Sequence, residues 1–138
     1  MIIDPLETVL QYLKQQSASL GISQIASQHH FGAGWKSDAA GLVVRLDGGP
    51  PDIYLPLHNV RLEMRFYGGS QAAALTLALG LVELSRQITR ELVNTTSGPA
   101  LLHCLLIDSG MSLLYDEQIN MDYCLQFYQA RIGEEPLV

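Results

Sequence analysis

Apolar residues along the chain follow two different spacings, and the change between them falls at the pair Gly68-Gly69. Every second residue from Val60 to Phe66 is apolar, which is the period of a strand with one buried face. After Ser70, apolar residues fall on almost every side of a helix. We expect this helix to run to about Val93, where the stretch "NTTSGP" ends it.

The long predicted helix has two apolar stripes. The first stripe can lie on a sheet and consists of Leu77, Leu81, Leu84, Ile88 and Leu92. The second lies about a quarter to a third of a turn away and consists of Leu75, Leu79 and Val82. An N-terminal helix or a neighbouring subunit would each cover the second stripe, and the pattern leaves both possibilities open.

Shorter patterns predict the remaining elements. Asp4-Pro5-x-Glu7 is a typical helix start, and the helix that follows is expected to end near Gln16. Residues 17–40 have no sustained period; a short strand is compatible with residues 22–26, and a long mobile loop is expected at about 27–40. Three more strands are predicted, at Gly41–Asp47, "ALLHCLLID" and "INMDYCLQFYQARI".

The order helix, strand, strand, long helix, strand, strand defines the expected fold. It predicts a single α+β domain over residues 1–138, in which an antiparallel sheet of about four strands carries a short N-terminal helix and one long helix.

Composition narrows the classes of protein. Only 16% of the residues are charged against 48% hydrophobic, so part of the surface is expected to be covered by partners. A net charge of −6 argues against a dedicated nucleic-acid binder. No stretch predicts a membrane span or a signal peptide. Cys104 and Cys124 are expected to be buried free thiols, although a disulfide between them stays open.

No motif predicts catalysis, a metal or a cofactor. "GAGWKS" ends in Lys-Ser like a phosphate-binding loop, but glycine is missing both before Lys36 and at Gln28. The pairs His29-His30 and His103-Cys104 point their side chains apart and offer too few ligands for zinc. There is no Gly-x-Ser-x-Gly nucleophile elbow. We therefore expect a protein that is not an enzyme.

Two features suggest contact surfaces. Arg61, Glu63 and Arg65 share one strand face at intervals of about 7 Å, so they form either a solvated face or a charge-complementary subunit interface. Trp35 stands in the long loop and either anchors a partner or folds back onto the core.

Three segments, in this order, carry a family resemblance: "DPLETVLQYL", then "VRLEMRFYGGSQAAALTLALGLVELSRQI", then "GPALLHCLLIDSGMSLLYDEQINMDYCLQFYQARI". The second joins a strand to a long helix through an aromatic-glycine turn, and the third contains a Gly-x-x-x-Leu-Tyr-Asp turn between two strands. From Asp4 to Ile132 this layout resembles the tail terminator proteins of long-tailed bacteriophages, also called tail completion or tail-to-head joining proteins.

The resemblance implies a ring, typically a hexamer, that caps the finished tail tube, stops its polymerisation and offers a docking surface to the head connector. The implied partners are other copies of the chain, the tube protein and the connector protein, while DNA passes through the hole without specific binding. The implied location is the head-proximal end of the virion tail, after assembly in the bacterial cytoplasm. A negative charge is compatible with such a channel.

The resemblance also assigns roles to residues. Subunit contacts are expected from the strand and the long helix, at Arg61, Glu63, Arg65, Leu75, Leu79 and Val82. Contact with the tube or connector is expected from the loop residues His30, Trp35 and Lys36. Two alternatives remain: a neck component on the portal side of the head–tail junction, and a cytoplasmic ligand-binding domain, which would need a pocket with converging polar groups.

Overall fold

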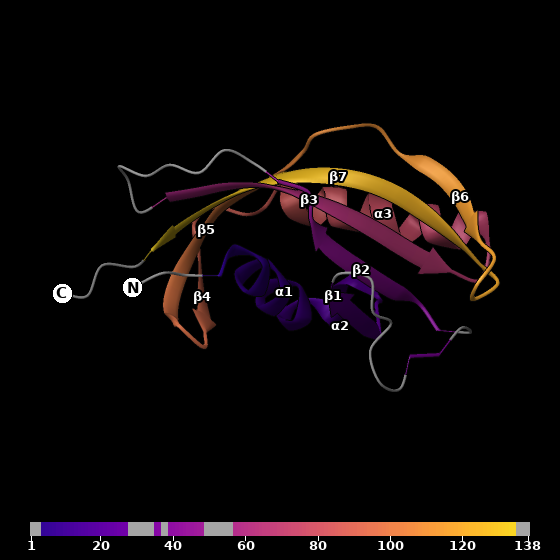
Figure 1. The fold of residues 1–138 in the computed structure, drawn as a ribbon, viewed down its shortest axis with the longest axis horizontal. Coiled ribbons are helices and arrows are strands. Elements are labelled where there is room, and N and C mark those ends of the chain that lie inside the picture. The colour runs from indigo at the N-terminus through magenta and orange to yellow at the C-terminus, as the bar shows by residue number, and fades with distance from the viewer. Residues whose placement is uncertain (1–3, 28–34, 37–38, 49–56, 135–138) are drawn as a thin grey trace.

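One mixed sheet organises the described part of the chain. The computed structural model describes residues 4–27, 35–36, 39–48 and 57–134. Within these ranges, seven strands form a single sheet that curls into a half-barrel, accompanied by three helices (Figure 1). The elements in chain order are α1 (Pro5–Gln15), α2 (Ser17–Leu20), β1 (Gln24–Ser27), β2 (Gly41–Leu46), β3 (Leu57–Gly68), α3 (Gln71–Ser85), β4 (Glu91–Thr95), β5 (Gly98–Ile107), β6 (Ser112–Asp116) and β7 (Met121–Glu134).

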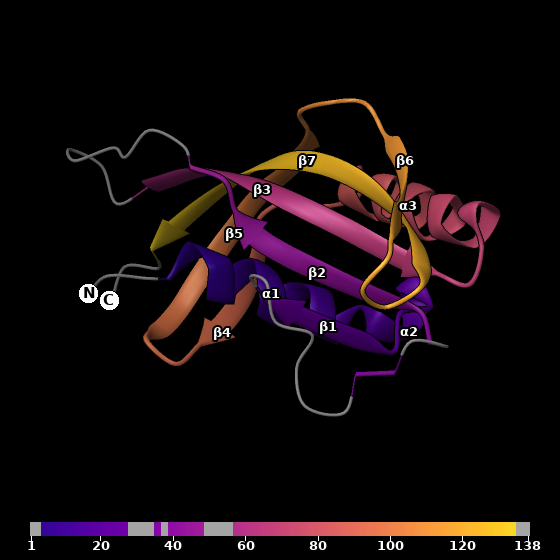
Figure 2. The same cartoon turned by 45° about the vertical axis from the view of Figure 1, so that its right-hand side comes forward.

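The two longest strands, β3 and β7, form the centre of the sheet. The strand order is β1-β2-β3-β7-β5-β4, and β6 pairs with the part of β7 that β5 does not reach. β1 and β2 are parallel, and the other pairs are antiparallel. β6 therefore forms a second short edge beside β7, at the end of the molecule where the β6–β7 hairpin turns (Figure 2).

The expected antiparallel sheet of about four strands with one long helix is wrong. Three of the seven strands in the described ranges, β1, β4 and β6, have four or five residues each. Such strands are too short to establish an alternation, and their sequences carry turn residues on both sides. In particular, the segment interpreted as a Gly-x-x-x-Leu-Tyr-Asp turn forms β6, which pairs with Met121–Leu125 of β7.

Helix α1 begins where the sequence predicts. The Asp4 side chain accepts hydrogen bonds from the backbone N–H groups of Leu6 and Glu7, and Pro5 occupies the first turn. The apolar stripe is buried beneath the curled sheet, where α1 packs against β4 on one side and against β1 and β2 on the other (Figure 2). Glu7 also accepts hydrogen bonds from the backbone N–H and hydroxyl of Thr96, which fastens α1 to the β4–β5 turn.

Helix α3 is shorter than predicted. Ser70 caps its start through a hydrogen bond from the N–H of Ala73, but the helix ends at Ser85 and not near Val93. The chain then turns through Arg90, whose φ is +59°, into β4, which pairs with β5. Two residues of the predicted helical stripe therefore lie outside the helix: Ile88 is buried in the connection that follows it, and Leu92 lies in β4 and is 57% exposed.

The buried residues of α3 are mainly small, and the leucine stripe predicted to lie on the sheet is confirmed only in part: Leu81 is buried in the core, while Leu77 and Leu84 pack against it half-buried. The buried residues of the helix are Ala74, Ala78, Leu81, Val82 and Ser85. This lets the helix lie very close to β3: a Cβ atom on Gly68 would stand 2.7 Å from the backbone nitrogen of Ala74. Of the stripe predicted for subunit contact, Val82 is buried, Leu75 is half-buried and Leu79 is 50% exposed.

Both long helices cover the same face of the sheet, which we call the inner face. Their apolar residues join the inner-face side chains of β2, β3, β5 and β7 in one core cluster. On β7 the inner face carries Cys124, Gln126 and Tyr128, all buried, while Tyr123, Leu125 and Phe127 point to the opposite, outer face. Cys104 and Cys124 are both free thiols; Cys124 is buried, as expected, whereas Cys104 is only half-buried.

The loop predicted at about 27–40 lies largely outside the described residues, which include only Ser27, Trp35, Lys36, Ala39 and Ala40 of that range. Across the described ranges, no helix combines the length and the hydrophobicity needed to cross a membrane.

Candidate functional site on the outer face of the sheet

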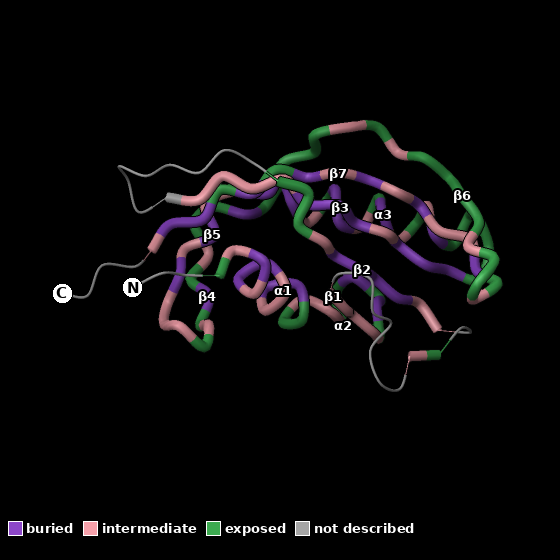
Figure 3. Tube along the Cα trace, in the orientation of Figure 1, coloured by how far each residue is buried: buried purple, intermediate pink, exposed green. Residues whose placement is uncertain are grey.

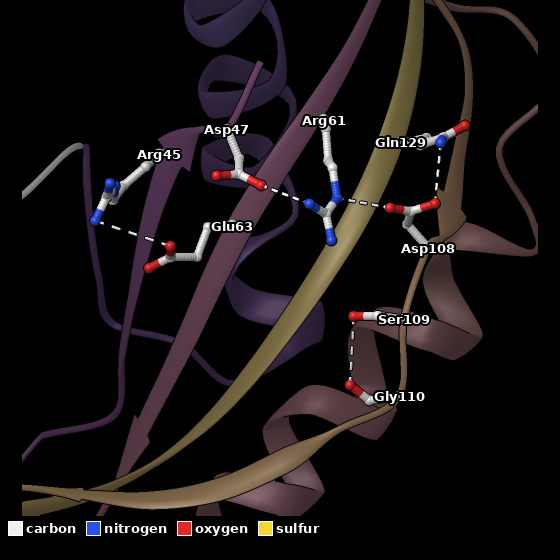
Figure 4. A network of polar contacts seen from close by, with 8 residues as sticks. All are labelled: Arg45, Asp47, Arg61, Glu63, Asp108, Ser109, Gly110 and Gln129. Atoms are coloured by element: carbon white, nitrogen blue, oxygen red, sulfur yellow. Dashed lines mark hydrogen bonds and ion pairs between the residues drawn. The ribbon is translucent and has the colours of Figure 1, made fainter. Parts of the chain in front are cut away.

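The outer face carries an ordered row of charged side chains from three strands. Arg61, Glu63 and Arg65 alternate along β3, as the sequence predicts. The strand register places Arg45 of β2 opposite Glu63, and places Gln129 of β7 opposite Arg61. The predicted row is therefore part of a wider polar surface, and Figure 4 draws the part of it around Arg61 and Glu63.

Arg61 lies between two carboxylates from distant parts of the chain. Its Nη1 atom is 2.8 Å from Oδ2 of Asp47, which follows β2, and its Nε atom is 2.6 Å from Oδ2 of Asp108, which follows β5 (Figure 4). The other oxygen of Asp108 accepts a hydrogen bond of 2.9 Å from Gln129. These contacts hold the guanidinium group of Arg61 in one orientation across β3 and β7.

Glu63 is the most buried charged group of the row, with 8% of the residue exposed. Arg65 donates from Nε to Oε1 of Glu63 over 2.7 Å, and Nη1 of Arg45 lies 3.8 Å from Oε2 (Figure 4 shows the Arg45 contact). A nearly buried carboxylate requires such partners, because its desolvation costs several kcal/mol.

The outer-face aromatic residues of β7 lie beneath the arginines. The guanidinium carbon of Arg61 is 4.2 Å from the ring centre of Phe127, and that of Arg65 is 5.3 Å from the ring centre of Tyr123. Each such stack contributes about 0.5–1 kcal/mol at a partly exposed position. The charged row is therefore also the cover of an apolar layer, so it is more than a solvated surface.

A hollow of about 550 Å³ opens beside Arg61, between β3, β7 and β5. It is lined by Asn59, Val60, Arg61, Cys104, Leu106, Gln129, Ala130 and Arg131. The register of β5 against β7 shifts between Leu102 and Cys104, which interrupts the regular surface at this place. The Nε atom of Arg131 donates to the side-chain oxygen of Asn59 over 3.0 Å.

Trp35 folds onto the other end of the outer face. Its ring meets that of Tyr67 edge to face, with 5.8 Å between the centres. It also lies directly over Gly41, where an added Cβ atom would overlap the indole ring. Gln24 of β1 fixes the neighbouring backbone by hydrogen bonds to the N–H and C=O of Lys36. Trp35 is thus half-buried against a small cluster built on Val43, Tyr67 and Met121.

Tyr67 is fully buried in this cluster, and its hydroxyl lies 3.2 Å from Oδ2 of Asp116. Burial raises the pKa of Tyr67 from 10.0 to about 12; Arg65 opposes this shift, and the Asp116 carboxylate adds to it. The hydroxyl therefore stays protonated in the folded chain at a pH where it ionises in the unfolded chain.

Alkaline pH is expected to destabilise the fold through Tyr67. Since the folded-state pKa is the higher one, the stability linked to this group is complete below pH 10 and is lost as pH rises towards 12. At pH 11 the loss amounts to about 1 kcal/mol. Urea unfolding of the wild type and of Tyr67→Phe between pH 9 and pH 11 measures this contribution. An equal pH dependence in the two proteins would contradict it.

Exposed apolar side chains gather on the segment from the end of β5 to β6. Of the eight exposed large hydrophobic residues in the described ranges, five lie between positions 106 and 115 and are 40–58% exposed: Leu106, Ile107, Leu113, Leu114 and Tyr115. Figure 3 shows this segment as a largely exposed border along β7. Leu113, Leu114 and Tyr115 belong to β6, whose outer backbone groups have no partner strand in the described structure.

The structure brings together part of the predicted site. Arg61, Glu63 and Arg65 share one face, whereas Trp35 and Lys36 lie at its far end, and Leu75, Leu79 and Val82 belong to α3. His30 lies outside the described residues.

Sequence reasoning missed Arg131, the stacking role of Phe127 and the apolar border. The alternation along β7 did place Phe127 on one strand face, but only the register shows which arginine covers it.

Two further findings bear on the function. Across residues 4–27, 35–36, 39–48 and 57–134, no group of three or more His, Cys, Asp or Glu side chains gathers in a way that could hold a metal ion. The sequence matches no family model and no curated protein. The resemblance to phage tail terminators therefore stays a prediction that rests on the sequence pattern.

Proposed function

We propose that this protein is a phage tail terminator: a structural virion protein that forms a ring on the end of the tail tube, ends tube polymerisation and receives the head connector. The observation that carries the proposal is the apolar border formed by residues 106–115. A neighbouring copy of the chain would cover this border in a ring.

The position of the border supports a contact between unlike surfaces. Among the described strands, β6 pairs with β7 alone, so its other edge offers backbone hydrogen-bonding groups, and the same strand carries exposed leucines. At the other edges of the sheet, β4 carries Leu92, which is 57% exposed, and β1 is a strand of four residues. A contact that joins two different edges is heterologous, and repeating it generates a closed ring when the rotation between copies closes.

The charges of the outer face are also compatible with the proposal. Arg45, Arg61 and Arg65 each pair with a carboxylate of the same chain. A face neutralised in this way offers few free cations to the phosphates of passing DNA, whose binding depends on Lys and Arg contacts. Together with a net charge of −6, this favours a ring through which DNA passes without adhering.

Molar mass in solution tests the assembly. Light scattering over a range of protein concentrations is expected to show a ring, or a monomer that converts to a ring as concentration rises. Leu114→Ser should lower the assembled fraction, because it removes an exposed apolar contact from β6. The control Leu46→Ser changes a leucine of similar exposure, 43% against 40%, at the end of β2, and should leave assembly unchanged. Equal behaviour of the two variants would contradict the role of the border.

A second experiment tests the tail function itself. Purified protein is added to polymerising tail tube protein from the same genome, and tube ends are examined by electron microscopy. The proposal expects rings at one tube end and shorter tubes as the protein is added. Binding to the portal side of the neck, with tube length unchanged, would instead identify a connector component.

A further inference from the structure

Arg131 differs from the other arginines of the outer face. Arg45, Arg61 and Arg65 contact carboxylates, at N–O distances from 2.6 to 3.8 Å. The one polar side-chain partner of Arg131 among the described residues is the neutral amide of Asn59. Arg131 is exposed and lines the 550 Å³ hollow together with Leu106, which is 58% exposed. The hollow thus offers a cation whose charge no described carboxylate balances, beside an uncovered apolar side chain.

Glu117 is the counterpart of Arg131, a negative charge without a described partner. It lies in the turn between β6 and β7, is exposed, and makes no hydrogen bond or ion pair with any residue in the described ranges. Its neighbour Asp116 is already engaged by Tyr67 and by the backbone N–H of Gln118. The exposed Leu114 and Tyr115 precede it on β6. The tip of this hairpin therefore combines a free carboxylate with exposed apolar surface.

The hollow and the hairpin tip cannot meet within one molecule. Arg131 stands near the end of β7 and the turn precedes its first residue, Met121, so about 30 Å of strand separates them at the usual rise per residue. Because the two surfaces lie at opposite ends of one strand, a copy that docks its tip into the hollow of a neighbour leaves its own hollow open for the next copy.

We propose that the hollow around Arg131 receives the β6–β7 hairpin of a second copy of this chain, with the Glu117 carboxylate bound to the Arg131 guanidinium and the apolar residues of β6 covering Leu106. This inference rests on the proposed self-assembly and specifies its contact. Charge complementarity selects the occupant, because the hairpin brings a carboxylate and apolar side chains in the combination that the hollow lacks. Arg61 forms a fixed wall of the hollow, since Asp47 and Asp108 hold its guanidinium group.

Charge reversal tests the pairing in the full-length protein. Arg131→Glu and Glu117→Arg are each expected to raise the dissociation constant of assembly at least about tenfold, because each places like charges together. An equimolar mixture of the two variants should assemble again, because the variants can alternate around a ring with an even number of subunits. Each contact then joins either Arg131 to Glu117 or the glutamate at position 131 to the arginine at position 117. The control Glu83→Arg reverses an exposed carboxylate on α3 and should leave assembly unchanged.

The outcomes separate this inference from the proposed function. If the wild type assembles and both single variants assemble equally well, or if the mixture fails to recover, the docking of the hairpin is overturned while the ring survives. A wild type that remains monomeric at every concentration overturns the docking as well, and end-capping of tail tubes then decides the proposed function. Circular dichroism of each variant shows whether the fold is retained.

Discussion

Gly68→Ala is expected to destabilise the protein by about 3 kcal/mol. The new Cβ atom would stand 2.7 Å from the backbone nitrogen of Ala74 and 3.0 Å from the backbone carbon of Ala73. These are backbone atoms of the first turns of α3, so no rotation of a side chain relieves the overlap. The helix must move away from β3, and the contacts of Ala74, Ala78 and Leu81 with the sheet weaken together.

The neighbouring residue provides the matched control. A Cβ atom added at Gly69 meets nothing within 4 Å, and the residue is exposed. Gly69→Ala should therefore change the free energy of unfolding by less than about 0.5 kcal/mol. Urea denaturation of both variants measures the difference. Equal stability of the two would show that the approach of α3 to β3 is not as close as described here.

Local chemistry made part of this fold predictable. The start of α1 follows from Asp4, which caps the helix, and the start of α3 follows from Ser70. The alternation along β3 predicted its faces, because a strand with one buried face imposes a period of two. Signals of this kind depend on a few adjacent residues, so they can be recognised without knowledge of the tertiary structure.

The end of α3 shows where such reasoning fails. Leu84, Ile88 and Leu92 continue the helical spacing, and nothing in the local sequence opposes a longer helix strongly enough. The chain instead leaves the helix after Ser85, because β4 gains the backbone hydrogen bonds and side-chain burial of a strand beside β5. Pairing with a distant strand is a tertiary effect, and it overrides a weak local preference.

The positions of the charged residues on the outer face were predictable from the sequence, but the residues that they contact were not. The two-residue spacing placed Arg61, Glu63 and Arg65 on one side of β3. Their contacts depend on the register of β3 with β2 and β7, which brings Asp47 and Phe127 to Arg61. The hollow also depends on a register shift in β5, for which the sequence contains no turn or glycine signal.

The pairing of the outer-face arginines with carboxylates of their own chain affects which residues would contact a second copy. Three arginines that already bind carboxylates of their own chain gain little from a further carboxylate on a partner. Arg131, held by an amide, has more to gain from one. The row is therefore expected to stabilise the subunit, while the apolar border and Arg131 direct contacts between subunits.

Glu63→Leu is expected to cost about 3 kcal/mol of stability, at the lower end of the range for breaking a buried ion pair. Glu63 is 8% exposed and bridges Arg65 at 2.7 Å and Arg45 at 3.8 Å, so its removal leaves two guanidinium groups close together without their shared carboxylate. An exposed ion pair would contribute only about 0.2–1 kcal/mol. The size of the loss therefore reports whether the carboxylate is desolvated.

A double-mutant cycle with Arg65→Leu completes the test. The double variant Glu63→Leu, Arg65→Leu should be more stable than the sum of the single losses predicts, by about 1 kcal/mol or more, since the second substitution removes one of the two guanidinium groups that Glu63→Leu alone leaves close together. Its remaining loss should reflect the stacking of Arg65 on Tyr123. Additive losses in urea unfolding would show that Glu63 and Arg65 act independently. In that case the row would be a solvated surface, and the stability of the outer face would come from its apolar layer alone.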